Sequence, residues 1–202
     1  MENDSYITLS ESCSAEIKIQ RSKFIANAYP VTTAEESHSI LEKIRKEYFD
    51  ARHHPYAYVL YGRDNFRYND DGEPAGSSGK PVYDAINKYN LQNVIVVVTR
   101  YFGGVKLGVG GLKRAYFEAA DGCLKNAKVK EVILKEKYVL KFDYSYISAV
   151  MKYLETNKIH IAENNSSEIV ELVCEVRLRD AEKFREELFD ITNGKILINY
   201  KT

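Results

Sequence analysis

The chain has 202 residues, of which 45% are hydrophobic, enough for one large packed domain or two small ones. Its 29 basic and 29 acidic residues cancel, which excludes a global field that draws it to nucleic acid or membrane. Three cysteines without metal-ligand spacing predict reduced thiols, as in a cytoplasmic protein. The sequence shows neither an apolar signal core nor an 18-residue apolar run, so no membrane association is expected.

The first part of the chain shows strand and helix patterns in turn. Alternating apolar and polar residues predict a hairpin, and Thr33 with Glu36 has the capping-box spacing of a helix start. The elements predicted here are a hairpin over 16–31, a helix over 33–49, a strand over 56–61, a long polar loop over 63–80 and a helix opened by Pro81.

The segment 93–116, NVIVVVTRYFGGVKLGVGGLKRAY, is the most informative. It predicts a strand buried on both faces, then a glycine-rich loop with cations, then a helix. Glycines let backbone N–H groups approach a ligand, and a helix N-terminus adds positive dipole, so an anion site for phosphate is expected. The candidate phosphate- or nucleic-acid-binding residues are Arg100, Tyr101, Phe102, Gly103, Gly104, Lys106, Gly108, Gly110, Gly111, Lys113 and Arg114.

Two alternatives stay open for this segment. Its glycines could instead serve a tight strand-to-helix connection through packing. Tyr101 and Phe102 suit either the core or the stacking of bases beside cations.

Two further groups are candidate accessory residues. Asp70, Asp71 and Glu73 could hold Mg²⁺ or act as acid and base, or they could form a solvated or ion-paired turn. His53 and His54 point oppositely on a strand, so one can lie in the core while the other faces the binding surface. The loop 76–80 fails the P-loop spacing. The sequence therefore predicts no catalytic residue, metal or cofactor.

From about residue 127 the pattern changes and a second unit begins. Apolar residues alternate over two strands and recur at helical spacing in two helices. The resulting order is βαββαβ, which is the ferredoxin-like plan. We expect domains over 1–134 and 135–202.

Two long motifs, DDGEPAGSSGKP (70–81) and VVVTRYFGGVKLGVGGLKRAY (96–116), closely resemble the IMPACT/YigZ family, as do His53-His54 and the strand after them. The resemblance covers roughly residues 10–125, and the second unit fits the extra domain of the bacterial YigZ-type branch by length and pattern. It implies an α+β protein: an N-terminal two-layer α/β domain with a left-handed βαβ crossover, like domain IV of elongation factor G, then a ferredoxin-like domain, like its domain V.

The likeness to a translation factor implies contact with RNA or the ribosome and a role in translation regulation, without enzymatic activity. The alternatives are an enzyme acting on a phosphorylated small molecule or nucleotide with Mg²⁺, and a regulator that docks a protein partner on a mixed-charge face. We expect Arg100, Lys106 and Arg114 to line one surface with the 70–73 loop nearby, within one Debye length, about 8–10 Å, as a single site requires.

Overall fold

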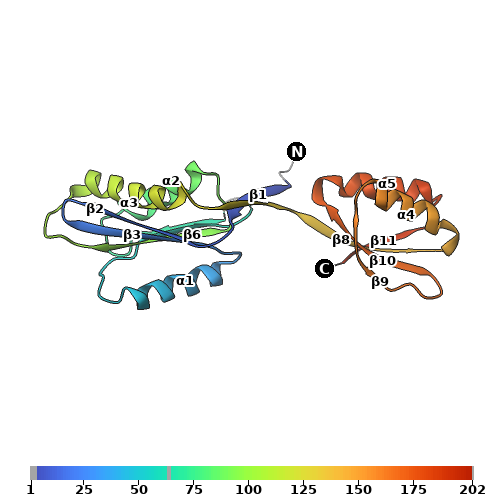
Figure 1. Ribbon diagram of the computed structural model, residues 1–202, viewed down its shortest axis with the longest axis horizontal. Coiled ribbons are helices and arrows are strands. Elements are labelled where there is room, and N and C mark those ends of the chain that lie inside the picture. The colour runs from blue at the N-terminus through green and yellow to red at the C-terminus, as the bar shows by residue number, and fades with distance from the viewer. Residues whose placement is uncertain (1–3, 63–64, 202) are drawn as a thin grey trace. The chain divides into compact units, whose positions relative to one another are not determined.

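The computed structural model describes residues 4–62 and 65–201 (Figure 1). The chain divides into two compact units, Tyr6–Val132 and Met1–Ser5 with Ile133–Thr202. The strands β1 (Ser5–Leu9) and β7 (Val129–Ile133) pair with each other, and the boundary between the units falls within both of them. None of the helices in the described part of the chain has the length and apolar character needed to span a membrane.

The first unit is built on a five-stranded sheet in the order β2-β3-β6-β4-β5. Because β3 and β4 both run antiparallel to β6, they are parallel to each other, and α1 joins them as a βαβ crossover. The strands and this helix are β2 (Cys13–Ile19), β3 (Ser22–Pro30), α1 (Ala34–Glu47), β4 (Tyr56–Val59), β5 (Phe66–Asn69) and β6 (Val94–Tyr101).

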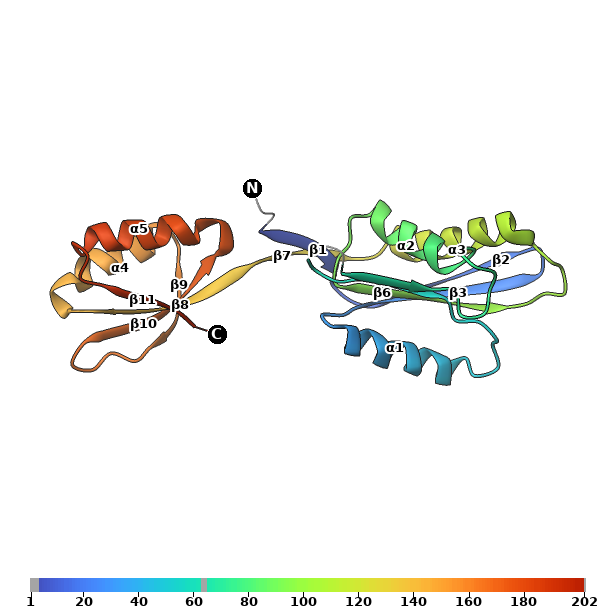
Figure 2. The same ribbon diagram turned by 180° about the vertical axis from the view of Figure 1, so that it is seen from behind.

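Helices cover both faces of this sheet, as Figure 2 shows. The helices α2 (Gly79–Lys88) and α3 (Gly108–Leu124) pack on one face with Val94, Val96 and Val98. The alternate β6 residues Ile95 and Val97 pack on the other face, against α1. The central strand is thus buried on both sides, as its β-branched run predicts, and α1 adds a third layer to the expected two.

The second unit carries a four-stranded antiparallel sheet in the order β11-β8-β10-β9, with both helices on one face (Figure 1). This confirms the ferredoxin-like plan and the α+β class. Its core lies between the sheet and the helices. The elements are β8 (Lys135–Phe142), a 3-10 turn (Tyr144–Tyr146), α4 (Ile147–Thr156), β9 (His160–Asn164), β10 (Val170–Arg177), a 3-10 turn (Leu178–Asp180), α5 (Ala181–Ile191) and β11 (Leu197–Lys201).

The N-terminal residue Asp4 belongs to this second unit. Its carboxylate accepts hydrogen bonds from the Arg177 guanidinium, and its carbonyl oxygen lies 2.8 Å from the Leu134 nitrogen. Sequence patterns contain no trace of this pairing, because its partners are more than a hundred residues apart.

Local expectations hold in most places, with a difference in the predicted loop and another at the start of α1. Residues 66–69 of the predicted loop form the edge strand β5, while 63–64 lie outside the described residues. Thr33 caps α1, with its hydroxyl accepting from the Glu36 nitrogen at 3.1 Å. The Glu36 carboxylate accepts a hydrogen bond from the backbone nitrogen of Thr32, at 2.6 Å, and not from that of Thr33 as in a capping box.

Candidate functional site

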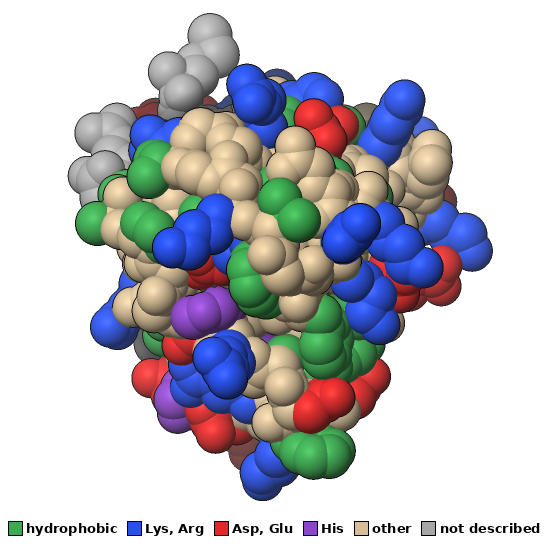
Figure 3. Space-filling view, turned by 90° about the vertical axis from the view of Figure 1, so that its left-hand side faces the viewer, with side chains coloured by type: hydrophobic (Ala, Val, Ile, Leu, Met, Phe, Trp, Pro, Cys, Tyr) green, Lys and Arg blue, Asp and Glu red, His purple; other side chains and the backbone are tan. Residues whose placement is uncertain are grey.

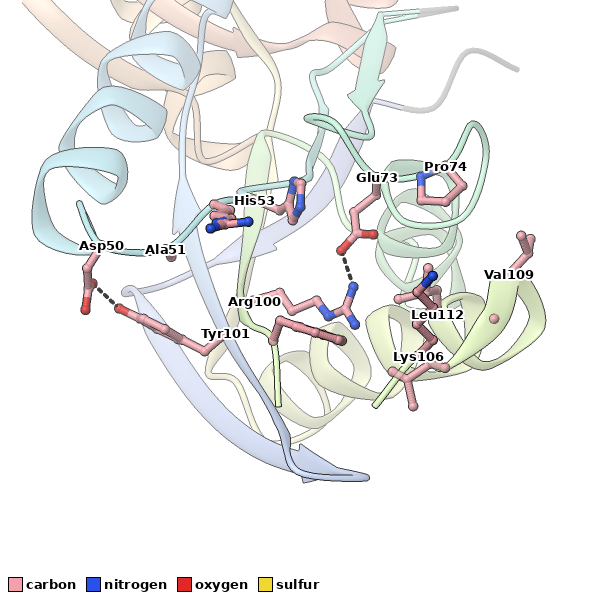
Figure 4. Close-up of a pocket in the computed structure, with 14 residues that line it drawn as sticks. Asp50, Ala51, His53, Glu73, Pro74, Arg100, Tyr101, Lys106, Val109 and Leu112 are labelled. Atoms are coloured by element: carbon pink, nitrogen blue, oxygen red, sulfur yellow. Dashed lines mark hydrogen bonds and ion pairs between the residues drawn. The ribbon is translucent and has the colours of Figure 1, made fainter. Parts of the chain in front are cut away.

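A cavity of about 650 Å³ lies at the carboxyl end of β6. Three segments line it: residues 50–53 ahead of β4, residues 73–74 ahead of α2, and the stretch from Arg100 to the first turns of α3 (Figure 4). The third segment follows β6, the central strand of the sheet, whose last residues Arg100 and Tyr101 line the cavity. Arg100, Lys106 and Glu73 of the acidic loop thus meet at one cavity, as expected, whereas Asp70, Asp71 and Arg114 do not line it.

Arg100 reaches this cavity as half of a buried ion pair. Its Nη1 lies 2.7 Å from Glu73 Oε1, which also accepts from the Tyr116 hydroxyl at 2.8 Å. The guanidinium sits over the rings of Phe24 and Phe102, at 5.6 and 5.4 Å. Burial, and then the charge of Glu73, raise the pKa of Tyr116 far above its usual value. Arg100 therefore forms the wall of the cavity, with its charge balanced by Glu73.

Other cations near the cavity carry no such partner. Lys106 and Arg52 line it, and Lys113 and Arg114 lie one turn further along α3. All four side chains are exposed, and none makes an ion pair with any described residue. Figure 3 looks onto this end of the first unit, where Lys and Arg side chains alternate with hydrophobic ones around a hollow that holds a histidine.

The first turn of α3 has no side-chain cap. Leu107 stands at the N-cap position and no acidic residue occurs in the first turn, so neither a hydroxyl nor a carboxylate takes up the backbone N–H groups there. A helix begun in this way presents donors and positive dipole to an anion.

The glycines of this segment serve different purposes. A Cβ on Gly103 would lie 2.0 Å from the Arg21 carbonyl carbon, so packing requires a glycine there. A Cβ on Gly111 would lie 3.1 Å from Leu107 Cβ, a tight contact that favours glycine. Gly104 and Gly108 have φ of +84° and +68°, which favours glycine. A Cβ on Gly110 would meet nothing within 4 Å. Packing thus explains part of the set and leaves the backbone at Gly110 open to a ligand.

The two aromatic residues beside Arg100 also differ. The Tyr101 hydroxyl donates to Asp50 Oδ1 at 2.7 Å, and this bond raises the pKa of Tyr101 to about 12. Phe102 is 57% exposed, so one face of its ring meets Arg100 while much of the side chain is open to solvent. Phe102 is therefore better placed than Tyr101 to stack on a ligand.

The two aspartates of the acidic loop, Asp70 and Asp71, stabilise the conformation of the loop. Asp70 accepts from the backbone nitrogens of Gly76, Ser78 and Gly79 at 2.7–2.9 Å. Partial burial alone would raise the pKa of Asp70, but these bonds outweigh it and keep the pKa below its usual value. Asp71 pairs with Arg45 at 2.7 Å and accepts from the His54 nitrogen. Among the described residues no cluster of three metal-ligating side chains occurs.

The adjacent histidines point apart, as the strand pattern predicts. His54 is buried, with Nδ1 3.1 Å from Thr99 Oγ1, and burial lowers its pKa. His53 lines the cavity. Sequence reasoning missed its neighbours there, Asp50 and Arg52, although their closeness to His53 in the chain was the available signal.

Comparison with known proteins agrees with this architecture. Residues 20–124 match the Impact N-terminal domain and residues 140–195 match a domain of unknown function, DUF1949. The IMPACT family member YvyE of Bacillus subtilis is 36% identical over 192 residues, which span 95% of this chain and 88% of YvyE. The chain belongs to the IMPACT family. YigZ of Escherichia coli, another member, is 28% identical over 89% of each chain.

More distant relatives match only in part. Human Protein IMPACT is 31% identical over 118 residues, which cover 55% of this chain and 35% of that protein. A crystal structure titled as a hypothetical protein superposes with a TM-score of 0.70 at 25% identity, over 99% of this chain and 98% of the other. A protein from Thermus thermophilus has a TM-score of 0.53 at 8% identity, over 98% of this chain and 29% of its own, and is similar in fold alone.

Proposed function

We propose that this IMPACT family member binds single-stranded regions of RNA, such as those exposed on the ribosome, at the β6–α3 end of its first unit, and that it regulates translation without being an enzyme. The observation that supports this most is the set of exposed cations Arg52, Lys106, Lys113 and Arg114, which have no acidic partner among the described residues and lie beside an uncapped helix N-terminus. Below, these residues are called the cation set.

The chemistry of the cavity fits a nucleic-acid strand. Phosphate oxygens can accept from the first-turn N–H groups of α3 and from Lys106, while a base stacks on the open side of Phe102. Stacking on an aromatic side chain contributes about 1–3 kcal/mol per base and tolerates any sequence. Local contacts of this kind do not need a net positive protein.

The cation set fixes the expected salt dependence. If all four side chains contact single-stranded phosphate, affinity should fall about 50-fold between about 50 and 200 mM salt. Arg100 is left out of this sum because its charge is already balanced by Glu73.

The test is fluorescence anisotropy of a labelled single-stranded RNA, and pelleting with purified ribosomes, across that salt range. A Lys106→Ala/Lys113→Ala/Arg114→Ala variant should bind weakly and lose about three quarters of the salt slope. The control variant, Lys125→Ala/Lys130→Ala/Lys152→Ala, removes the same charge from exposed positions away from the cavity lining. Equal weakening in both variants, or binding by neither variant nor the wild type, would contradict the proposal.

An Mg²⁺-dependent enzyme has less support from this geometry. The Asp70 and Asp71 carboxylates are engaged by backbone nitrogens and Arg45, and Glu73 is buried against Arg100 and Tyr116. Recruiting a metal to any of them would break bonds that hold the loop in place.

A further inference from the structure

His53 is a cavity residue that phosphate binding and base stacking leave unused. Its Nδ1 lies 2.9 Å from the backbone oxygen of Asp71. A carbonyl oxygen only accepts, so in the neutral ring Nδ1 carries the proton and Nε2 keeps a free lone pair. The fold thereby selects the tautomer in which Nε2 is a hydrogen-bond acceptor.

The position of this ring is fixed from two sides. A Cβ on Gly72, where φ is +85°, would lie 3.2 Å from His53 Nδ1, so the ring packs directly against that glycine. The His53 carbonyl accepts from the Arg100 nitrogen at 3.1 Å, which ties its backbone to β6. Figure 4 draws the His53 ring and the Lys106 side chain on either side of the Arg100 guanidinium. A ring held in this way presents Nε2 in a constant direction.

The other polar side chains of the cavity have different roles. Arg52 and Lys106 only donate. Glu73 and Asp50 are carboxylates: Glu73 Oε1 accepts from Arg100 and Tyr116, and Asp50 Oδ1 accepts from the Tyr101 hydroxyl. Within the described cavity lining, His53 Nε2 is thus a neutral side-chain acceptor beside cations and an exposed aromatic ring.

We propose that His53 Nε2 accepts a hydrogen bond from the 2′-hydroxyl of a ribonucleotide, whose phosphate lies at the start of α3 and whose base stacks on Phe102. The inference rests on the proposed function and deepens it, because the 2′-hydroxyl is the group by which a protein tells RNA from DNA. The cavity of about 650 Å³ is of a size that small-molecule sites commonly have, so it can take one unstacked nucleotide.

The test compares RNA, DNA and 2′-O-methyl RNA of one sequence, at one salt concentration, by competition anisotropy. The wild type should prefer RNA roughly 3–10-fold, the worth of one net hydrogen bond, and should bind 2′-O-methyl RNA like DNA, since the methylated oxygen cannot donate. His53→Ala should bring the RNA-to-DNA ratio close to one, because RNA loses more affinity than DNA does. His53→Gln, whose amide oxygen can accept, should keep part of the preference.

The controls separate the two proposals. His160→Ala, at an exposed histidine of the second unit, should keep the wild-type ratio, and matched melting temperatures exclude a folding defect. Equal binding of RNA and DNA by the wild type, or an unchanged ratio in His53→Ala, would overturn the role of His53 alone. Absence of RNA binding by the wild type would overturn the proposed function, and this inference with it.

A separate observation concerns two cysteines of the first unit. Cys13, the first residue of β2, has its Sγ 3.1 Å from the Sγ of Cys123 in the last turn of α3. Cys13 is half-buried and Cys123 is buried. The hydrogen bond from Cys123 lowers the pKa of Cys13, and the same contact raises the pKa of Cys123. The accessible thiol is therefore the one that ionises first, which makes it the nucleophile.

We infer that a hydroperoxide converts this pair to a disulfide. The Cys13 thiolate attacks one peroxide oxygen, so that an S–O bond forms and the O–O bond breaks, giving a sulfenic acid on Cys13. The other peroxide oxygen leaves with the bonding electron pair and takes a proton from solvent, as water from hydrogen peroxide or as an alcohol from an organic hydroperoxide. The Cys123 sulfur then attacks the Cys13 sulfur, the S–S bond forms, and the oxygen leaves as water with the Cys123 proton. The product would tie β2 to α3.

Peroxide treatment followed by denaturation, alkylation and intact-mass measurement tests this. The wild type should lose two hydrogens and retain one alkylatable thiol, Cys174, and reduction should restore all three. Cys174→Ser should still form the disulfide, whereas Cys123→Ser should stop at a modified Cys13. Three alkylatable thiols after treatment, or a sulfinic acid on Cys13 in the wild type, would overturn the inference.

Discussion

Two charged surfaces of this protein use their cations in opposite ways. On the open face of the ferredoxin-like sheet, Lys141 lies 2.7 Å from Glu171, and Lys201 lies 2.8 Å from Glu163. At the β6–α3 end of the first unit, the cation set has no such partners among the described residues. A chain whose charges cancel in sum thus places four cations without a described acidic partner at one end of its first unit, which a total charge cannot show.

This difference indicates which of the two surfaces would bind a single strand of RNA. Sheets that bind RNA through an open face stack bases on exposed aromatic residues. Here the alternation of β8 turns Tyr138, Leu140 and Phe142 into the core and puts Lys137 and Lys141 on the other face, where acids pair with them. On this open face of the sheet, called the ion-paired face below, acids balance the lysines. At the β6–α3 end, the cations and the first-turn N–H groups of α3 remain available to bind an anion.

The largest expected effect comes from the one paired cation at the cavity. Arg100→Ala leaves the buried Glu73 carboxylate without its counter-charge, and we expect a loss of roughly 3–5 kcal/mol in the free energy of unfolding. Urea unfolding at neutral pH measures it. Lys106→Ala, at an exposed and unpaired cation of the same cavity, should change stability by less than about 0.5 kcal/mol. Equal effects of the two substitutions on stability would contradict the distinction between Arg100 as a structural cation and Lys106 as a cation available to a ligand.

The next effect tests the loop that carries Glu73. Asp70→Asn removes the charge that accepts from three backbone nitrogens, and should cost about 1–3 kcal/mol at pH 7. Because the folded pKa of Asp70 is below its unfolded value, its contribution is complete above the unfolded pKa and disappears as pH falls through the folded one. The gap between wild type and variant should therefore narrow in acid. A gap that stays constant down to about pH 2 would contradict this account.

Much of the fold follows from local pattern. The hydrophobic periodicity fixes β2, β3, α1, β6 and α3, and the βαββαβ order of the second unit, because burial on one or two faces leaves a period in the sequence. The strand β5 was not predicted because all four of its residues are exposed. Without a buried face, its sequence FRYN has no apolar period.

The site was harder to predict than the fold because its pairings are long-range. Nothing near Arg100 in the sequence reveals that Glu73 balances it, and nothing near Asp70 reveals the backbone nitrogens that it holds. The glycine segment shows the same limit. The sequence places Gly103 and Gly110 in one motif, and only the structure shows that the first is fixed by contact with Arg21 and the second is open.

That distinction gives a prediction in which stability and binding change in opposite directions. Gly110→Ala adds a methyl group into open space within α3, so it should raise the free energy of unfolding by about 0.5–1 kcal/mol. It should weaken RNA binding, because the added carbon obstructs approach to the first-turn N–H groups. Gly122→Ala is the matched control in the same helix, equally open but far along it, and should stabilise without changing affinity. Unchanged RNA affinity in Gly110→Ala would contradict the prediction that RNA approaches the backbone at Gly110.

The smallest expected effect lies on the ion-paired face. Lys141→Ala breaks an exposed pair with Glu171 and should cost only about 0.2–1 kcal/mol, less at high salt. Its effect on RNA affinity should be negligible, since Glu171 already balances that charge locally, whereas Lys113→Ala removes an unbalanced one. Each of these two single variants loses one lysine, so their net charges are equal. A difference between their salt slopes for RNA binding therefore reports whether the lost lysine was paired with an acid. A slope that falls equally in both would mean that RNA senses the total charge of the protein and not the arrangement of its cations.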